Sequence, residues 1–324
     1  MIIPKYWAEH KERRKCNTKS ITVKRMGWSD FTQYEAEKMA QNRVDEAFKK
    51  IEAGEKVVFI EKRVAYNGTE GMPIREEILN EVGEAVITRN IYGAQCLNVK
   101  DVLFIDIDYD LNISSYMRKG IIWIGIVAAL FLSVILRNGY ILSVVGILLV
   151  IGSLLKKKDC NNYNKEIENI ERKNLERIKL FCEKNREFKF RAYKTPAGLR
   201  LLAINDLYNP KDETTVKVMK ELGSDSNYIQ MCINQNCFRA RVSPKPWRIN
   251  LKESLPHKTV IWPYTPEKLE ARQKWVDKYE LKSQNYAACK YIQTIGTGDE
   301  CRDALRIQEL HDELSRANED LPIA

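Results

Sequence analysis

Three aspartates alternate with apolar or aromatic residues near the middle of the chain, in the segment 104–110 (FIDIDYD). Side chains two residues apart on a β-strand share one face, so Asp106, Asp108 and Asp110 would project together. Carboxylate oxygens are ligands that Mg²⁺ and Mn²⁺ prefer, and such ions hold substrate phosphates. The spacing therefore predicts a metal site for phosphoryl or nucleotidyl transfer. A half-buried strand with an acidic, solvent-facing edge shows the same alternation, and the sequence leaves both interpretations open.

A second set of candidate residues is basic and is expected on or beside strands of the C-terminal half. Its members are Arg191, Arg200, Arg239, Arg241 and Arg248. Guanidinium groups bind phosphate or carboxylate oxygens bidentately, so this set predicts a site for an anionic small molecule or a nucleotide. Arg239 and Arg241 would share one strand face. The same arginines could instead pair with Asp106 and Asp108 in a structural network of ion pairs.

The eight cysteines allow a structural zinc site without defining one. Four residues separate Cys232 from Cys237, which is at the edge of the spacing found in zinc-binding motifs. Cys289 and Cys301 would supply further ligands. The alternative is that these side chains are small buried hydrophobic groups. The sequence contains no Walker phosphate-binding loop and no G-x-G-x-x-G motif.

Two resemblances to known families follow from these motifs. The acidic strand followed by 193–201 (YKTPAGLRL) resembles the core of primase-polymerases of the archaeo-eukaryotic primase type. The nucleotide-contacting histidine of that family is missing, since Arg200 or Leu202 stands in its place, so the resemblance implies at most a shared fold with lost catalysis. The segments 191–206 and 231–249 resemble an uncharacterised family of bacterial two-helix membrane proteins. That resemblance implies an architecture and no activity.

Two apolar runs, 121–136 and 140–155, are separated by only three residues. Each run has 16 residues, and a helix of that length rises ~24 Å, against ~30 Å for the hydrocarbon core of a bilayer. Lysines and arginines gather on both outer flanks, whereas Arg137 alone lies at the turn. The positive-inside rule then predicts a transmembrane hairpin over 118–158, spanning or re-entrant, with both termini in the cytoplasm. A helical hairpin buried in a large core is the alternative.

The overall composition agrees with a protein at an anionic surface or with an anionic ligand. The 324 residues carry a formal net charge of +9, and 30% of them are charged. This excess suits a lipid bilayer with anionic headgroups, but it is too small to predict nucleic-acid binding. The first 15 residues contain no apolar core of a signal peptide. The prediction is an integral membrane protein of the bacterial inner membrane with reduced cytoplasmic thiols.

The predicted fold class is α+β, with a mixed or antiparallel sheet interrupted by the transmembrane hairpin. Thr32 and Glu35 form a capping-box pattern at the start of a helix that ends at Gly54. The segments 188–195 and 199–204 flank a Pro-Ala-Gly turn and predict a β-hairpin. The predicted division is 1–117 and 188–324 as two parts of one cytoplasmic domain, 118–158 as the hairpin, and 159–187 as a charged helix.

Three functions compete at this point. The first is a membrane-tethered cytoplasmic binding or regulatory module for an anionic or nucleotide-like ligand held by the arginines. The second is a metal-dependent nucleotidyl- or phosphotransferase that uses Asp106 and Asp108 with Mg²⁺ or Mn²⁺. The third is a membrane scaffold for protein partners. The sequence does not decide whether the protein is an enzyme.

Overall fold

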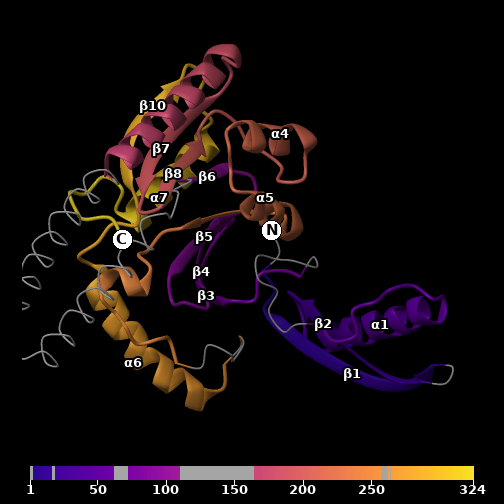
Figure 1. Cartoon of the computed structure of the whole chain (residues 1–324). Helices are drawn as coiled ribbons and strands as arrows, with labels where there is room; N and C mark the ends of the chain where they lie inside the picture. Colours follow the sequence, from indigo (N-terminus) through magenta and orange to yellow (C-terminus); the bar gives the residue numbers. More distant parts are fainter. Residues whose placement is uncertain (1–2, 17–18, 62–71, 110–163, 257–261, 263) are drawn as a thin grey trace, which may run out of the picture. The chain divides into compact units, whose positions relative to one another are not determined.

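The computed structural model describes residues 3–16, 19–61, 72–109, 164–256, 262 and 264–324 (Figure 1). The chain divides into two compact units, which are described separately. The first unit combines Met1–Ile107 with Phe181–Ala324, and the second is Asp108–Leu180. The first unit therefore draws its elements from both ends of the chain, and it contains the site described below.

The described chain forms runs of consecutive strands with helices between or after them. The strands are β1 (Tyr6–Cys16), β2 (Lys19–Ser29), β3 (Glu77–Val82), β4 (Ala85–Arg89), β5 (Gln95–Val99), β6 (Phe104–Asp108), β7 (Lys189–Thr195), β8 (Gly198–Ala203), β9 (Phe238–Arg241) and β10 (Lys290–Gly296). The helices are α1 (Gln33–Glu52), α4 (Glu213–Glu221), α5 (Ser226–Gln235), the 3₁₀ helix η2 (Pro246–Ile249), α6 (Pro266–Ser283) and α7 (Arg302–Ser315). Residues 164–184 are also helical.

Two four-stranded sheets carry the functional side chains. One has the strand order β10-β7-β8-β6, and the other has the order β3-β4-β5-β9. The hairpin β7–β8 is antiparallel and pairs Tyr193 with Arg200. All six residues of β8 are buried, and Arg200 is the charged residue among them. A buried charge is costly without a partner, so we expect Arg200 to form an ion pair within the sheet.

The N-terminal hairpin β1–β2 packs on α1 through a small apolar core. The two strands pair antiparallel over their whole length, from Tyr6 opposite Ser29 to Cys16 opposite Lys19. Thr32 caps α1 by accepting a hydrogen bond from the backbone N–H of Glu35. Gly27 lies so close to α1 that a Cβ atom there would overlap its backbone. The helix and the hairpin therefore meet backbone to backbone.

Helix α5 and the turn that follows it position two residues of the site. Asp225 caps α5 by accepting a hydrogen bond from the N–H of Tyr228 at 2.8 Å. Asn236 ends the helix in the left-handed region, at φ 51°, a conformation that asparagine tolerates better than most residues. The chain then enters β9 at Phe238. Gln235 and Arg239 are thereby held on either side of a sharp turn.

Several predicted elements are confirmed and others were missed. The helix from Thr32 and the hairpin around 196–198 occur as predicted. The long hairpin β1–β2 was not predicted, because its alternation is carried by charged residues such as Arg13 and Lys15. The sequence also predicts strands at 57–66 from two short apolar runs, but where the structure describes this segment, Ile60 forms only an isolated bridge to Lys24. Residues 62–66 lie outside the described part of the chain.

The membrane part of the prediction must be corrected. Across the described residues, no helix combines the length and apolar character that crossing a bilayer requires. Helix α1, for example, buries Ala40, Val44 and Phe48 and keeps its charged side chains on the other faces. The α+β assignment fits, but the predicted transmembrane element and the integral-membrane location are contradicted by this finding. The segment 118–158, to which the hairpin was assigned, lies outside the described residues.

Candidate functional site

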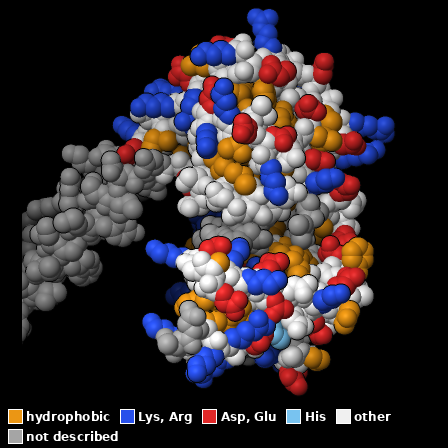
Figure 2. Space-filling model, turned by 90° about the vertical axis from the view of Figure 1, so that its right-hand side faces the viewer, with side chains coloured by type: hydrophobic (Ala, Val, Ile, Leu, Met, Phe, Trp, Pro, Cys, Tyr) orange, Lys and Arg blue, Asp and Glu red, His pale blue; other side chains and the backbone are white. Residues whose placement is uncertain are grey.

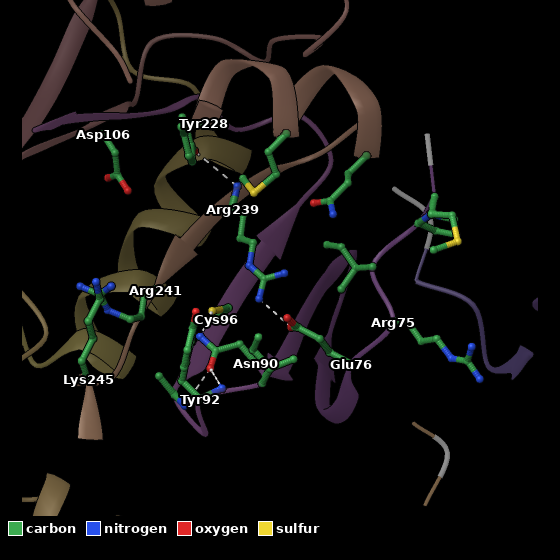
Figure 3. A pocket seen from close by; sticks show the side chains of 17 residues that line it. Arg75, Glu76, Asn90, Tyr92, Cys96, Asp106, Tyr228, Arg239, Arg241 and Lys245 are labelled. Atoms are coloured by element: carbon green, nitrogen blue, oxygen red, sulfur yellow. Dashed lines mark hydrogen bonds and ion pairs between the residues drawn. The ribbon is translucent and has the colours of Figure 1, made fainter. Parts of the chain in front are cut away.

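A cavity of about 300 Å³ in the first unit gathers several of the predicted site residues (Figure 3). Its walls come from the segment 72–76, the loop after β4, β5, β6, α5, and the stretch from β9 to Lys245. Both four-stranded sheets contribute strands to it. Four basic and two acidic side chains line the cavity. Its electrostatics therefore depend on which of these charges are already paired.

Asp106 is held by Arg200, its neighbour in the sheet. The guanidinium donates from Nε to Asp106 Oδ1 at 2.7 Å and from Nη2 to Oδ2 at 3.1 Å. A third bond runs from Arg200 Nη1 to the backbone carbonyl of Arg241 at 2.8 Å. Arg200 is only 3% exposed. Burial alone would lower its pKa, but the Asp106 carboxylate outweighs burial and raises the pKa of Arg200 above its usual value.

Arg239 and Glu76 form a second ion pair inside the cavity. Arg239 Nη2 donates to Glu76 Oε2 at 2.6 Å, and the same oxygen accepts from Thr88 Oγ1 at 2.8 Å. Figure 3 shows Arg239 pointing toward Glu76, with Arg241 and Lys245 on the other side of Arg239. Both partners of this pair are mostly buried. The charge of Arg239 is thus neutralised within the protein.

Arg241 differs from Arg200 and Arg239 because it forms no ion pair with a residue that the structure describes. Its Nε is buried and has no hydrogen-bond partner, and none of the ion pairs found in the described part of the chain includes it. Burial lowers the pKa of Arg241, and the nearby Arg200 lowers it further; Cys96 and Asp106 raise it but do not cancel these two effects. Arginine keeps its proton in proteins, so a lowered pKa here means an unfavourable positive charge rather than a neutral group. This site would be stabilised by an anion.

An exposed aromatic pair includes one residue that lines the cavity together with Arg241. Tyr92 lines the cavity and meets Trp247 edge to face, with ring centroids 5.5 Å apart. The Lys245 ammonium lies over the Trp247 ring at 5.3 Å. Tyr92 is 39% exposed and Trp247 53% exposed. Two residues of the cavity wall, Tyr92 and Lys245, therefore contact the accessible ring of Trp247.

The structure separates the remaining predicted anion ligands from this cavity. Arg191 donates to Asp312 Oδ2 at 2.8 Å and lies over the ring of Tyr291. Arg248 belongs to η2 and does not line the cavity. Of the five predicted arginines, the structure thus brings together Arg200, Arg239 and Arg241. On the face shown in Figure 2, basic and acidic side chains are interspersed, so the excess positive charge does not form a single stripe there.

The predicted metal ligands do not form a cluster in the described residues. Asp106 engages both carboxylate oxygens with Arg200, Asp108 is exposed at the end of β6, and Asp110 lies outside the described part of the chain. No group of three or more His, Cys, Asp or Glu side chains that could hold a metal ion occurs among the described residues. The Mg²⁺ or Mn²⁺ site stays a prediction without supporting geometry.

The four cysteines of the predicted zinc site lie in different surroundings. Cys232 and Cys237 are fully buried, and burial raises the pKa of the Cys237 thiol to about 11. Cys301 precedes α7 and is partly exposed. Buried neutral thiols are typical of small hydrophobic core residues. Like the Mg²⁺ site, the zinc site gains no support from the residues that the structure describes.

Sequence reasoning missed a polar network around Cys289. Its Sγ lies 4.0 Å from His311 Nε2, and His311 Nδ1 lies 3.1 Å from Asp312 Oδ1. Asp312 also accepts a hydrogen bond from Tyr193 at 2.6 Å. Cys289 and His311 are 0% exposed, so no substrate reaches the sulfur and the network is structural. Cys289 and His311 are 22 residues apart, and no local sequence pattern predicts their contact.

Comparisons with known proteins leave the class of this fold and site open. The chain matches no protein-family model, no curated protein and no solved structure. The two family resemblances stated from the sequence therefore stay predictions, and the functional argument rests on the geometry of the cavity.

Proposed function

We propose that this protein is a binding module for a small oxyanion, a phosphate or carboxylate group, which Arg241 holds in the cavity. The observation that carries the proposal is the buried Nε of Arg241, which makes no hydrogen bond. A buried charged donor without a partner is costly, and folded proteins rarely retain one unless another molecule completes it. An oxyanion supplies both the counter-charge and the hydrogen-bond acceptors.

The neighbouring residues support this role because their own charges are already satisfied. Arg200 is bound to Asp106, and Arg239 is bound to Glu76. Arg200 also binds the carbonyl of Arg241 and so fixes the backbone from which the Arg241 side chain extends. A ligand therefore meets a prearranged guanidinium, which reduces the ordering cost of binding.

Isothermal titration calorimetry on the full chain tests the proposal, with sodium phosphate, sodium succinate and sodium chloride as separate titrants at equal ionic strength. Phosphate, succinate or both should bind, and chloride should not. The variant Arg241→Met keeps the apolar stem and removes the charge, so it should abolish this binding. Arg306→Met is the matched control because Arg306 is an exposed arginine of α7. If neither oxyanion binds the wild type, or if Arg241→Met binds unchanged, the proposal fails.

A further inference from the structure

A second unsatisfied polar group in the same cavity concerns the rest of the ligand. Gln235, the last residue of α5, lines the cavity and is only 6% exposed. Its Oε1 is buried and accepts no hydrogen bond from any residue that the structure describes. A buried amide oxygen without a donor is unfavourable, because folding removes its water without replacing it. A ligand that donates an N–H or O–H to Gln235 would correct this.

The cavity that Gln235 and Arg241 line also has apolar side chains in its wall. Met72, Ile74 and Met231 line the same cavity and are almost fully buried. Met231 precedes Gln235 by four residues on α5, so both side chains occupy one face of the helix. Methionine side chains adapt to flat apolar groups and make favourable contacts with aromatic rings. This part of the cavity therefore suits a ring with a hydrogen-bonding edge.

The cavity thus offers a ligand two chemically different polar groups, Gln235 Oε1 and the guanidinium of Arg241. The chain runs from Gln235 through the turn at Asn236 into β9, where Arg239 and Arg241 lie two residues apart. That spacing separates their Cα atoms by about 7 Å along an extended strand. The neutral pair of Arg239 and Glu76 lines the same cavity. A ligand that satisfies both Gln235 and Arg241 must carry a hydrogen-bond donor and an anionic group at separate positions.

The geometry points to a nucleoside monophosphate as the ligand class, an inference that rests on the proposed oxyanion binding at Arg241. The base would pack against Met72, Ile74 and Met231 and donate to Gln235 Oε1, and the phosphate would bind Arg241. A sugar phosphate without a base would place hydroxyl groups against this apolar wall. The volume of about 300 Å³ lies at the lower limit for small-molecule sites, which favours one nucleotide over a polynucleotide.

Calorimetry on the full chain separates this inference from the proposed function. The titrants are adenosine, guanosine, cytidine and uridine 5′-monophosphates, ribose 5-phosphate and inorganic phosphate. At least one nucleoside monophosphate should bind 10-fold or more tightly than ribose 5-phosphate. The variant Gln235→Leu should weaken that nucleotide by about 10- to 100-fold and leave the binding of inorganic phosphate unchanged. The control Gln230→Leu, on the exposed face of the same helix, should change neither affinity.

Each result of these titrations decides one of the two statements. If ribose 5-phosphate binds as tightly as every nucleotide, or if Gln235→Leu binds the nucleotide normally, the nucleotide inference is overturned while oxyanion binding stands. Gln235→Leu could lose the binding of both the nucleotide and inorganic phosphate while its circular dichroism spectrum is unchanged. Gln235 would then support phosphate binding at Arg241 rather than contact a base, and the nucleotide inference would also be overturned. If no phosphate compound binds the wild type, both statements fall.

Discussion

Replacing Arg241 by methionine should make the anion-free protein more stable, although the change removes a charged side chain from its proposed binding site. In the structure, the buried Nε of Arg241 has no acceptor, and Arg200 lies close enough to depress the pKa of Arg241. An unsatisfied buried polar group costs about 1–3 kcal/mol. Methionine keeps the apolar stem that packs along the cavity wall, so little packing is lost.

The net gain in the free energy of unfolding should be about 1–2 kcal/mol. For a domain of 150–250 residues, each kcal/mol moves the melting temperature by about 2–4 °C. The first unit is close to this size, so Arg241→Met should melt about 2–8 °C above the wild type in a phosphate-free buffer of low chloride concentration. Urea denaturation followed by circular dichroism gives the same quantity in kcal/mol.

Added phosphate should reverse the order of the two proteins. A ligand at 100 times its dissociation constant stabilises the native state by about 2.7 kcal/mol. The wild type should gain this stability, and Arg241→Met should gain none. The exposed control Arg306→Met should stay within about 0.5 kcal/mol of the wild type at either phosphate concentration. A loss of more than about 1 kcal/mol in anion-free Arg241→Met would refute the reasoning, since Arg241 would then support the fold.

Three further predictions concern the surroundings of the site and the fold. Asp106→Asn should lower the free energy of unfolding by about 3 kcal/mol, because it leaves the buried Arg200 without its counter-ion. Urea denaturation measures this loss. A loss below about 1 kcal/mol would mean that the Asp106–Arg200 pair contributes no more than a surface ion pair. Burial would lower the pKa of His311, but hydrogen bonds to Asp312 and Cys289 outweigh it and raise this pKa. The contribution of His311 to stability is therefore complete below the unfolded pKa of about 6.5 and is lost as pH rises through the higher folded pKa. The urea midpoint, measured from pH 5 to 9, should fall over that window, and a flat profile would contradict the assignment. Gly27→Ala should lower the free energy of unfolding by about 2–4 kcal/mol, because its Cβ would overlap the backbone of α1. Gly54→Ala should lower it by only about 1 kcal/mol, because Gly54 has a positive φ but open space around it. Equal melting temperatures for the two variants would exclude this explanation.

The elements that the sequence predicted well are those in which local chemistry and final packing agree. The helix from Thr32 has a cap, a periodic apolar face and a glycine at its end, and each feature acts within a few residues. The hairpin at 188–204 similarly combines two apolar strands with a turn of suitable composition. The hairpin β1–β2 was missed because long-range packing on α1 decides its structure, while its own residues are mostly charged.

The site could be predicted only in part, because charge pairing is a property of the tertiary structure. The sequence supplied both competing interpretations of the arginines, as anion ligands and as partners of Asp106. In the structure, Arg200 forms an ion pair with Asp106 and Arg239 forms one with Glu76. The buried Nε of Arg241 has no hydrogen-bond partner. Glu76 and Gln235 had no sequence signal, since neither belongs to a recognisable motif. Their part depends on a cavity formed by segments more than 150 residues apart.

The three hydrogen bonds of Arg200 have a mechanical consequence. One guanidinium on β8 binds Asp106 in its own sheet and the carbonyl of Arg241 in the other sheet. The Arg200 side chain therefore links the two sheets through Asp106 and Arg241, which both line the cavity. Any sliding of one sheet against the other must break this contact and displace Arg241. A bound anion should therefore slow amide hydrogen exchange in β6 and β9 together, although the two strands never pair.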